Sequence, residues 1–341
     1  MNRRILPVFL LAFFLGVGCS SQSTNGPVTM RVGYFPNITH SQAMIGIADG
    51  TFARAFGDSA KIDAKVFNAG PSAIEAMFAG QLDLTYIGPN PAINGYVKSN
   101  GAALRIVAGA TSGGAVLVVR SDAGINAAAD FRGKKIASPQ LGNTQDVALR
   151  AWLMHQGFTL KERGGDTQVI PTANPDILTL FLKKAIDAAW VPEPWGARLV
   201  REAGGRIFLD ERALWQNGQF TTACVVVSKK FLDEHPDLVR KWLEAHVELT
   251  QRINADPAAA KQKLNGEIER LTGKALPAEV LDDAWSRLRV TYDPVRASLI
   301  GSADAAFKLG FLGDAPPNLD HIYDLTLLNQ VLKEKGLAQV Q

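Results

Sequence analysis

The chain has 341 residues, of which 47% are hydrophobic and 20% are charged, and its formal net charge is +3. This is the composition of an ordinary globular protein, and the length suits two domains of roughly 100–200 residues each. No run of Lys or Arg is long enough to indicate a nucleic-acid partner, and no apolar stretch after residue 20 is long enough to span a bilayer. The two cysteines exclude a disulfide framework and a cysteine-based metal cluster.

The first 19 residues have the pattern of a targeting segment. Two arginines precede the apolar run 5–18, which ends at Cys19, and residues 20–27 form a polar tether. Small residues before a cysteine, followed by a Ser-, Asn- and Gly-rich stretch, resemble a bacterial lipoprotein signal in which Cys19 would be lipidated. The third residue before the cysteine is Gly16 instead of a large aliphatic residue, so secretion with plain cleavage nearby is the alternative. Both interpretations predict export.

The first strand is predicted over residues 28–35 (VTMRVGYF). It ends in a turn that contains Asn37, Thr39 and His40, and an amphipathic helix follows as far as about Gly50. The start of that helix would direct free backbone N–H groups and partial positive charge beyond the end of the strand. These three residues are therefore candidate ligand contacts, and a surface or capping role is the alternative for His40.

The most informative stretch is LDLTYIGPNP, residues 82–91, a short apolar strand that ends at a turn with Gly88 and Asn90. A similar stretch, IDAAWVPEPW, covers residues 186–195, and the two are offset by 104 residues. Ligands of open α/β sheets bind beyond the carboxyl ends of the strands. The repeat therefore predicts two similar lobes whose turns form the walls of one cleft, although helix–strand–turn units recur in every α/β protein.

Another buried strand, residues 104–110, leads into a Thr-Ser-Gly-Gly turn with Ser112 and Gly113. Glycines in such a turn leave backbone N–H groups exposed and let a ligand approach the main chain closely. In the second half of the chain, the strand 134–138 is followed by Asn143 and Thr144, either of which can cap the next helix.

The turn after the second copy of the repeat contains Glu193 and Trp195. Glu193 has two interpretations, which are a contact to a ligand amine and a cap on the following helix. Trp190 and Trp195 are expected to supply flat apolar walls. Cys224, in the strand-like stretch TTACVVVS, is expected to be a free and inert core thiol.

These elements predict an α/β protein with one lobe over residues 28–120 and a second over residues 121–222. Residues 223–341 would return to the first lobe and add C-terminal helices. Strand crossings near 118–124 and 222–228 would form a two-stranded hinge.

The sequence offers few groups for catalysis. It contains no nucleophile elbow, P-loop, HExxH or CxxC motif, and its five histidines are scattered. The turns offer hydroxyl, amide and backbone N–H donors without Lys or Arg. We therefore expect a binding protein with no catalytic residue, metal or cofactor, whose ligand is a small anionic solute.

Several segments resemble the periplasmic substrate-binding proteins of ABC importers for aliphatic sulfonates, taurine and nitrate. They are VGYFPNITHSQAMIGIADGTF, KVFNAGPSAIEAMFAGQLDLTYIGPNPAINGYVKS, IVAGATSGGAVLVV, GKKIASPQLGNTQDVALRAWL and WVPEPW. The resemblance covers residues 28–330 and implies the two-lobed type II periplasmic binding protein fold, a monomer, and partnership with a membrane permease and its ATPase. By the same resemblance, the ligand-binding residues would be Asn37, Thr39, His40, Gly88, Asn90, Ser112, Gly113, Asn143, Thr144, Glu193 and Trp195. Nearer members often have Asp-Pro where this chain has Glu193-Pro194, which puts the depth of the pocket in question.

The resemblance makes an aliphatic sulfonate the expected solute. Nitrate, bicarbonate and a pyrimidine thiamine precursor are the alternatives within the family, and a pyrimidine-synthesis enzyme on the same fold is the alternative outside transport. A sensory binding protein that docks on a receptor is a further alternative. The expected location is the periplasm or the outer face of the cell membrane, with a lipid anchor on Cys19.

Overall fold

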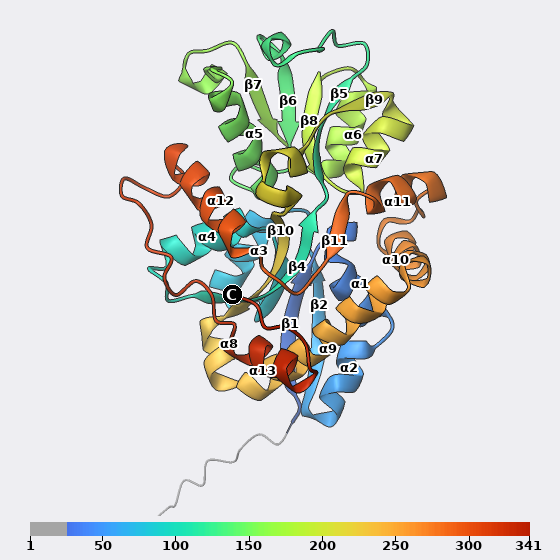
Figure 1. Cartoon of the computed structure of the whole chain (residues 1–341), viewed down its shortest axis with the longest axis vertical. Helices are drawn as coiled ribbons and strands as arrows, with labels where there is room; N and C mark the ends of the chain where they lie inside the picture. The colour runs from blue at the N-terminus through green and yellow to red at the C-terminus, as the bar shows by residue number, and fades with distance from the viewer. Residues whose placement is uncertain (1–25) are drawn as a thin grey trace, which may run out of the picture.

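A computed structural model describes residues 26–341, which form two α/β lobes, each built on one mixed sheet (Figure 1). The signal peptide predicted over residues 1–19, most of the tether and the lipidation site Cys19 lie outside the described residues. The first sheet has the strand order β11 (Leu288–Val290), β4 (Leu104–Gly113), β10 (Thr221–Ser228), β3 (Leu84–Ile87), β1 (Val28–Tyr34), β2 (Ala60–Val66). The second has the order β7 (Gln168–Pro171), β6 (Lys135–Ser138), β8 (Ala188–Pro192), β5 (Ala115–Arg120), β9 (Gly205–Asp210).

The two sheets repeat one topology, as the sequence repeat predicts. β1 pairs in parallel with β2 and β3 in the first sheet, as β6 does with β7 and β8 in the second. The carboxylate of Asp83 accepts the backbone N–H of Arg31 at 2.8 Å, and that of Asp187 accepts the N–H of Lys135 at 2.9 Å. The repeated aspartate therefore ties the same two strands together in each lobe.

Helices cover both faces of the first sheet (Figure 1). On one face lie α1 (Ser41–Ala48), α2 (Thr51–Phe56), α8 (Lys229–Glu234), α9 (Pro236–Ala255), α10 (Pro257–Thr272), α11 (Ala278–Trp285) and α13 (Thr326–Glu334). On the other lie α3 (Gly70–Phe78), α4 (Pro89–Lys98) and α12 (Arg296–Lys308). Cys224 lies in this second core with its side chain fully buried, and burial raises the pKa of its thiol to about 12, as expected for an inert thiol.

The second sheet is covered by α5 (Thr144–His155) on one face and by α6 (Asn174–Leu182) and α7 (Trp195–Ala203) on the other. Side chains alternate along its central strand β8, so Trp190 points into the core under α5. Its indole N–H donates to Glu211 at 2.8 Å and the side chain has no exposed surface. The prediction that Trp190 forms a wall of the cleft is therefore wrong.

The chain crosses between the sheets at Gly113–Ala115 and again between β9 and β10, so the crossings predicted near 118–124 and 222–228 are wrong in position. Both Gly113 and Gly114 have positive φ angles, 76° and 79°, which end one strand and turn the chain into the next. The apolar run 104–120 is therefore two strands, and β5 pairs in the second sheet although the predicted boundary assigned it to the first lobe.

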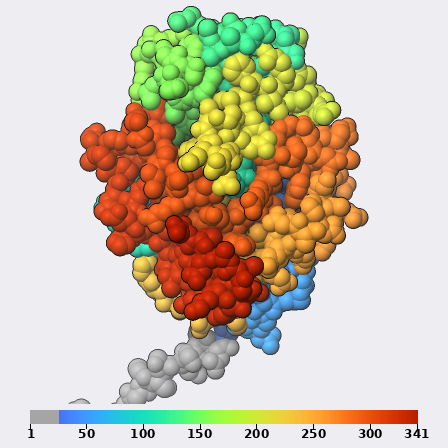
Figure 2. All heavy atoms as spheres, in the orientation of Figure 1, coloured from blue at the N-terminus to red at the C-terminus, as the bar shows by residue number. Residues whose placement is uncertain are grey.

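The second crossing contains the short helices η5 (Glu211–Leu214) and η6 (Gln216–Gly218) and packs against α12 (Figure 2). A Cβ atom on Gly301 of α12 would lie 2.9 Å from the ring of Trp215 in this segment. Other short helices are η1 (Ile38–His40), η2 (Gly57–Ser59), η3 (Ala128–Phe131) and η4 (Lys161–Arg163). No helix within residues 26–341 is both long and apolar enough to cross a membrane.

Candidate functional site

A cavity of about 30 Å³ lies between the lobes, at the carboxyl ends of their strands. Gly88, which follows β3, and Pro192, which ends β8, both line it, so the two copies of the repeat do face one cleft. Six of the predicted ligand-binding residues line the cavity: Asn37, Thr39, His40, Gly88, Asn143 and Thr144.

No residue that lines the cavity carries a formal charge at neutral pH. Instead, four helices of both lobes begin at its wall, at Gly70 (α3), Gly88 (the cap of α4), Thr144 (α5) and Asn174 (α6). Each helix start contributes partial positive charge and free backbone N–H groups. Their convergence on an uncharged cavity is suited to a small anion that is recognised by hydrogen bonds.

His40 is a neutral hydrogen-bond donor in this wall. The side chain is 2% exposed, and burial lowers its pKa to about 3. Its Nδ1 accepts the backbone N–H of Phe35 at 3.3 Å, so in the neutral ring Nε2 carries the proton. The alternative of a surface position is therefore wrong, and the ring makes no capping hydrogen bond to α1.

We expect the ring of His40 to stay neutral between pH 5 and pH 8, which NMR titration of its ring protons can test. An unfolded His takes up a proton near pH 6.5, while the folded state resists protonation down to about pH 3. Folding stability that His40 contributes is therefore complete above pH 6.5 and is lost as the pH falls toward 3. The variant His40→Gln should lose less stability than the wild type between pH 7.5 and pH 4.5. A His40 resonance that titrates near pH 6.5 in the folded protein would contradict this.

Thr144 brings a hydroxyl group of the second lobe against the first. Its side chain is 5% exposed, and Oγ1 has no hydrogen-bond partner among the described residues. A Cβ atom on Gly88 would lie only 2.2 Å from that Oγ1. The lobes therefore approach so closely that a side chain at position 88 would displace the Thr144 hydroxyl, which is an unused donor at the cavity wall.

Asn37 and Trp195 also connect the lobes. The indole N–H of Trp195 donates to Oδ1 of Asn37 at 2.9 Å, and the guanidinium of Arg198 lies over the indole ring at 4.7 Å. Because Oδ1 is occupied, the amide NH₂ of Asn37 is the group left to donate toward the cavity. Trp195 itself lies outside the small cavity, in the wall of a larger neighbouring one.

Sequence reasoning missed Asn174, which lines the cavity from the start of α6 and is 4% exposed. Its Oδ1 has no partner among the described residues. The missed signal was Asn-Pro at a helix start, which also occurs at Asn90-Pro91. Asn143, in contrast, is the expected helix cap, and its Oδ1 accepts the N–H of Asp146 at 2.7 Å.

Besides Trp195 and Glu193, three predicted residues do not line the cavity, and each of them is engaged in contacts within the protein. The amide of Asn90 donates to the carbonyl of Ser302 at 3.2 Å. The hydroxyl of Ser112 accepts the N–H of Phe220 at 3.2 Å. The Gly113 N–H donates to the Phe220 carbonyl at 3.1 Å, so the backbone donors expected at this turn are used within the protein.

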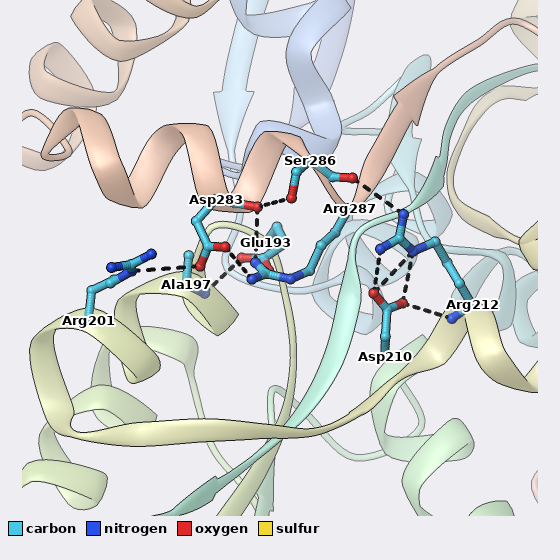
Figure 3. Close-up of polar contacts among 8 residues, drawn as sticks. All are labelled: Glu193, Ala197, Arg201, Asp210, Arg212, Asp283, Ser286 and Arg287. Carbon is cyan, nitrogen blue, oxygen red and sulfur yellow. Dashed lines mark hydrogen bonds and ion pairs between the residues drawn. The ribbon is translucent and has the colours of Figure 1, made fainter.

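Glu193 belongs to an ion-pair network beside the first crossing (Figure 3). One carboxylate oxygen accepts the N–H of Ala197 at 2.9 Å, which is the predicted cap of α7, and the other pairs with Arg287 at 2.7 Å. Arg287 also pairs with Asp283 of α11 at 2.5 Å. Because β11 of the first sheet follows Arg287 directly, this network links the two lobes and engages both oxygens of Glu193.

Residues 23–265 match the NMT1-like family. The chain is 27% identical over 266 residues to the taurine-binding periplasmic protein of Escherichia coli (strain K12), which covers 77% of this chain and 78% of that protein.

Two solved structures have a similar backbone. One is the alkanesulfonate-binding protein SsuA from Xanthomonas axonopodis pv. citri bound to MOPS (TM-score 0.70, 21% identity, 85% of this chain and 96% of that chain). The other is the periplasmic nitrate-binding protein NrtA from Synechocystis PCC 6803 (TM-score 0.74, 16% identity, 90% of this chain and 89% of that chain). The likeness confirms the predicted type II periplasmic binding protein fold.

Proposed function

Because the chain belongs to the NMT1-like family, we propose that it is the extracytoplasmic solute-binding protein of an ABC importer. It captures a small organic oxyanion, with an aliphatic sulfonate as the first candidate, and passes it to a membrane permease driven by an ATPase. It is a binding protein and not an enzyme. Relatives that are named as binding taurine, alkanesulfonates and nitrate support this assignment.

One observation carries the proposal, namely an uncharged cavity at which helices of both lobes begin. A sulfonate is fully ionised at any physiological pH, so its capture needs preorganised donors and no proton transfer. A hydrogen bond to a charged group contributes about 1.5–3 kcal/mol, and micromolar affinity needs about 8 kcal/mol. Four to six donors, less the cost of ordering, would reach that value, and the wall offers Asn37, His40, Thr144 and backbone N–H groups.

The size of the cavity favours a second candidate, nitrate or bicarbonate. A space of about 30 Å³ holds a chemical group about as large as two water molecules. Such anions would fit it whole, whereas a sulfonate would place only its head group there. The lack of a Lys or Arg in the wall favours the sulfonate.

The solute would also control the conformation of the protein. Its contacts come from both lobes, so binding would stabilise the closed arrangement about the two crossings. We further propose that the protein is exported and that Cys19 carries a lipid anchor, as the pattern of residues 1–19 indicates. Labelled palmitate in the wild type, absent from Cys19→Ser, would test the anchor.

The variant Thr144→Val tests the site. Since the Thr144 hydroxyl has no partner among the described residues, its replacement by a methyl group should leave the free energy of unfolding unchanged or slightly higher. Loss of a hydrogen bond to a charged solute should lower the affinity about 10- to 100-fold. Calorimetric titration with taurine, ethanesulfonate, nitrate and a hydroxymethylpyrimidine identifies the solute and measures the loss of affinity in the variant.

Thr85→Val is the matched control. Thr85 is fully buried in β3, and its hydroxyl donates to the carbonyl of Gly33 at 3.1 Å. Its loss should reduce stability by about 1 kcal/mol and leave solute affinity unchanged. Binding of nitrate or the pyrimidine, with no response to any sulfonate, would overturn the preferred solute.

A further inference from the structure

A second and larger cavity, of about 500 Å³, lies between the lobes and adjoins the small one. We call it the outer chamber and the 30 Å³ cavity the inner cavity. Three asparagines, Asn37, Asn68 and Asn174, line both spaces. The two therefore share one polar wall.

The walls of the outer chamber are mostly apolar. They include Val66 at the end of β2, and Ile268, Leu271 and Leu276 in and after α10. On the side of the second lobe they include Pro194 and Trp195. Since the walls come from both lobes, the chamber changes when the lobes move apart.

Charged groups at the chamber largely neutralise one another. Arg198 and Glu202 form two hydrogen bonds, at 2.9 and 3.0 Å, and Arg198 also lies over the ring of Trp195. Lys274, the remaining charged residue of the wall, is exposed to solvent. The chamber therefore offers apolar contact surface and little attraction for a second charged group on a ligand.

We propose that the outer chamber binds an apolar tail of the solute whose anionic head lies in the inner cavity. This inference rests on the proposed function and narrows it to organic anions with a tail well beyond two carbons. The inner cavity has room for roughly two water-sized groups, while about 500 Å³ is in the range of cavities that hold drug-sized ligands. Val66 is 46% exposed, which is high for an apolar side chain in a cleft, and a tail would cover it.

Trp195 is a positioning residue for this tail. Its indole N–H is fixed by Asn37 and one face of its ring by Arg198, so the ring is held in place in the wall of the outer chamber. A fixed aromatic side chain contributes contact area at little cost in conformational entropy.

The test is a calorimetric titration of the purified protein with linear alkanesulfonates from methanesulfonate to octanesulfonate. Each added methylene that enters the chamber should raise the affinity about fourfold until the chamber is filled. Taurine should bind more weakly than propanesulfonate, since its ammonium group would meet apolar walls.

The variant Val66→Asn should lower the affinity for hexanesulfonate about five- to tenfold and change that for methanesulfonate less than twofold. The matched control is Ile300→Asn, because Ile300 is 53% exposed on α12 and lies outside the chamber. It should change neither affinity.

The outcomes separate this inference from the proposed function. If methanesulfonate binds but the affinity stays constant or falls as the alkyl chain lengthens along the series, the proposed role of the outer chamber is overturned. The sulfonate site in the inner cavity would then remain supported. Absence of binding by every sulfonate would overturn both.

Discussion

Replacing Gly88 with alanine is expected to lower solute affinity about 100-fold while the protein stays folded. The added Cβ would lie 2.2 Å from Oγ1 of Thr144, closer than non-bonded atoms can approach, and 3.2 Å from its Cβ, which is a tight contact. Either Thr144 must turn away or the lobes must stop short of each other. Both changes remove hydrogen bonds to the solute, each of which contributes about 1.5–3 kcal/mol.

The backbone at Gly88 allows this experiment to report on the site alone. Its φ of −71° and ψ of 156° are ordinary for alanine, so the substitution causes no local strain. Thermal unfolding of the free protein should therefore change little, while calorimetry records the loss of affinity.

Gly266→Ala is the matched control for that variant. Gly266 lies inside α10, and no atom lies within 4 Å of the position of an added Cβ. Alanine there should raise stability by about 0.5–1 kcal/mol and leave affinity unchanged. Wild-type affinity in Gly88→Ala would show that the approach of Thr144 to Gly88 is not part of the binding arrangement.

The second large effect is expected from Arg287→Met, which should reduce the free energy of unfolding by about 3–5 kcal/mol. Glu193 has no exposed surface and Arg287 is 8% exposed, so the variant leaves a buried carboxylate without its nearest cation. Urea unfolding monitored by tryptophan fluorescence measures the loss.

The loss of stability in Arg287→Met should depend on pH through the protonation of Glu193. Burial raises the pKa of Glu193, and Arg287 opposes that rise. In Arg287→Met the pKa should rise further, so the folded state takes up a proton at a higher pH than the unfolded state does. The deficit relative to wild type should therefore shrink as the pH falls from 8 toward 5.

Two further variants complete the comparison. Glu193→Gln combined with Arg287→Met should be more stable than Arg287→Met alone, because no charge is then buried without a partner. Lys229→Met, which breaks the exposed Lys229–Asp233 pair, should cost less than about 1 kcal/mol. If Arg287→Met were as mild as Lys229→Met, the buried pair would not stabilise the junction of the lobes.

Local signals in the chain predicted several residues that line the cavity. The turn at Gly88 and the helix start at Asn143–Thr144 were recognised because Gly, Pro and Asn act on the backbone within a few residues of their own position. The repeat around Asp83 and Asp187 predicted two equivalent sheets, since a strand pattern and its terminating turn are also local features.

Other predictions failed because they depended on the direction of a side chain or on contact partners that are distant in the sequence. Trp190 has a flat apolar side chain, as expected of a cleft wall. Side chains alternate between the two faces along a central strand, however, and this directs Trp190 into the core. Ser112 and Gly113 have the flexible turn expected of a ligand loop, but Phe220 on the second crossing takes their polar groups. No local pattern indicated a role for Arg287, because its partner Glu193 is 94 residues away in the sequence.

The sequence alone determined the repeated α/β unit and the turns that end its strands, because both depend on short-range periodicity and backbone preference. Only the tertiary structure decided which of those turns share a cavity. Two pairs at its wall, Gly88 with Thr144 and Asn37 with Trp195, join residues on different lobes. Such contacts form when two independently built sheets close on each other, and no pattern along the chain specifies the distance or the angle at which they meet.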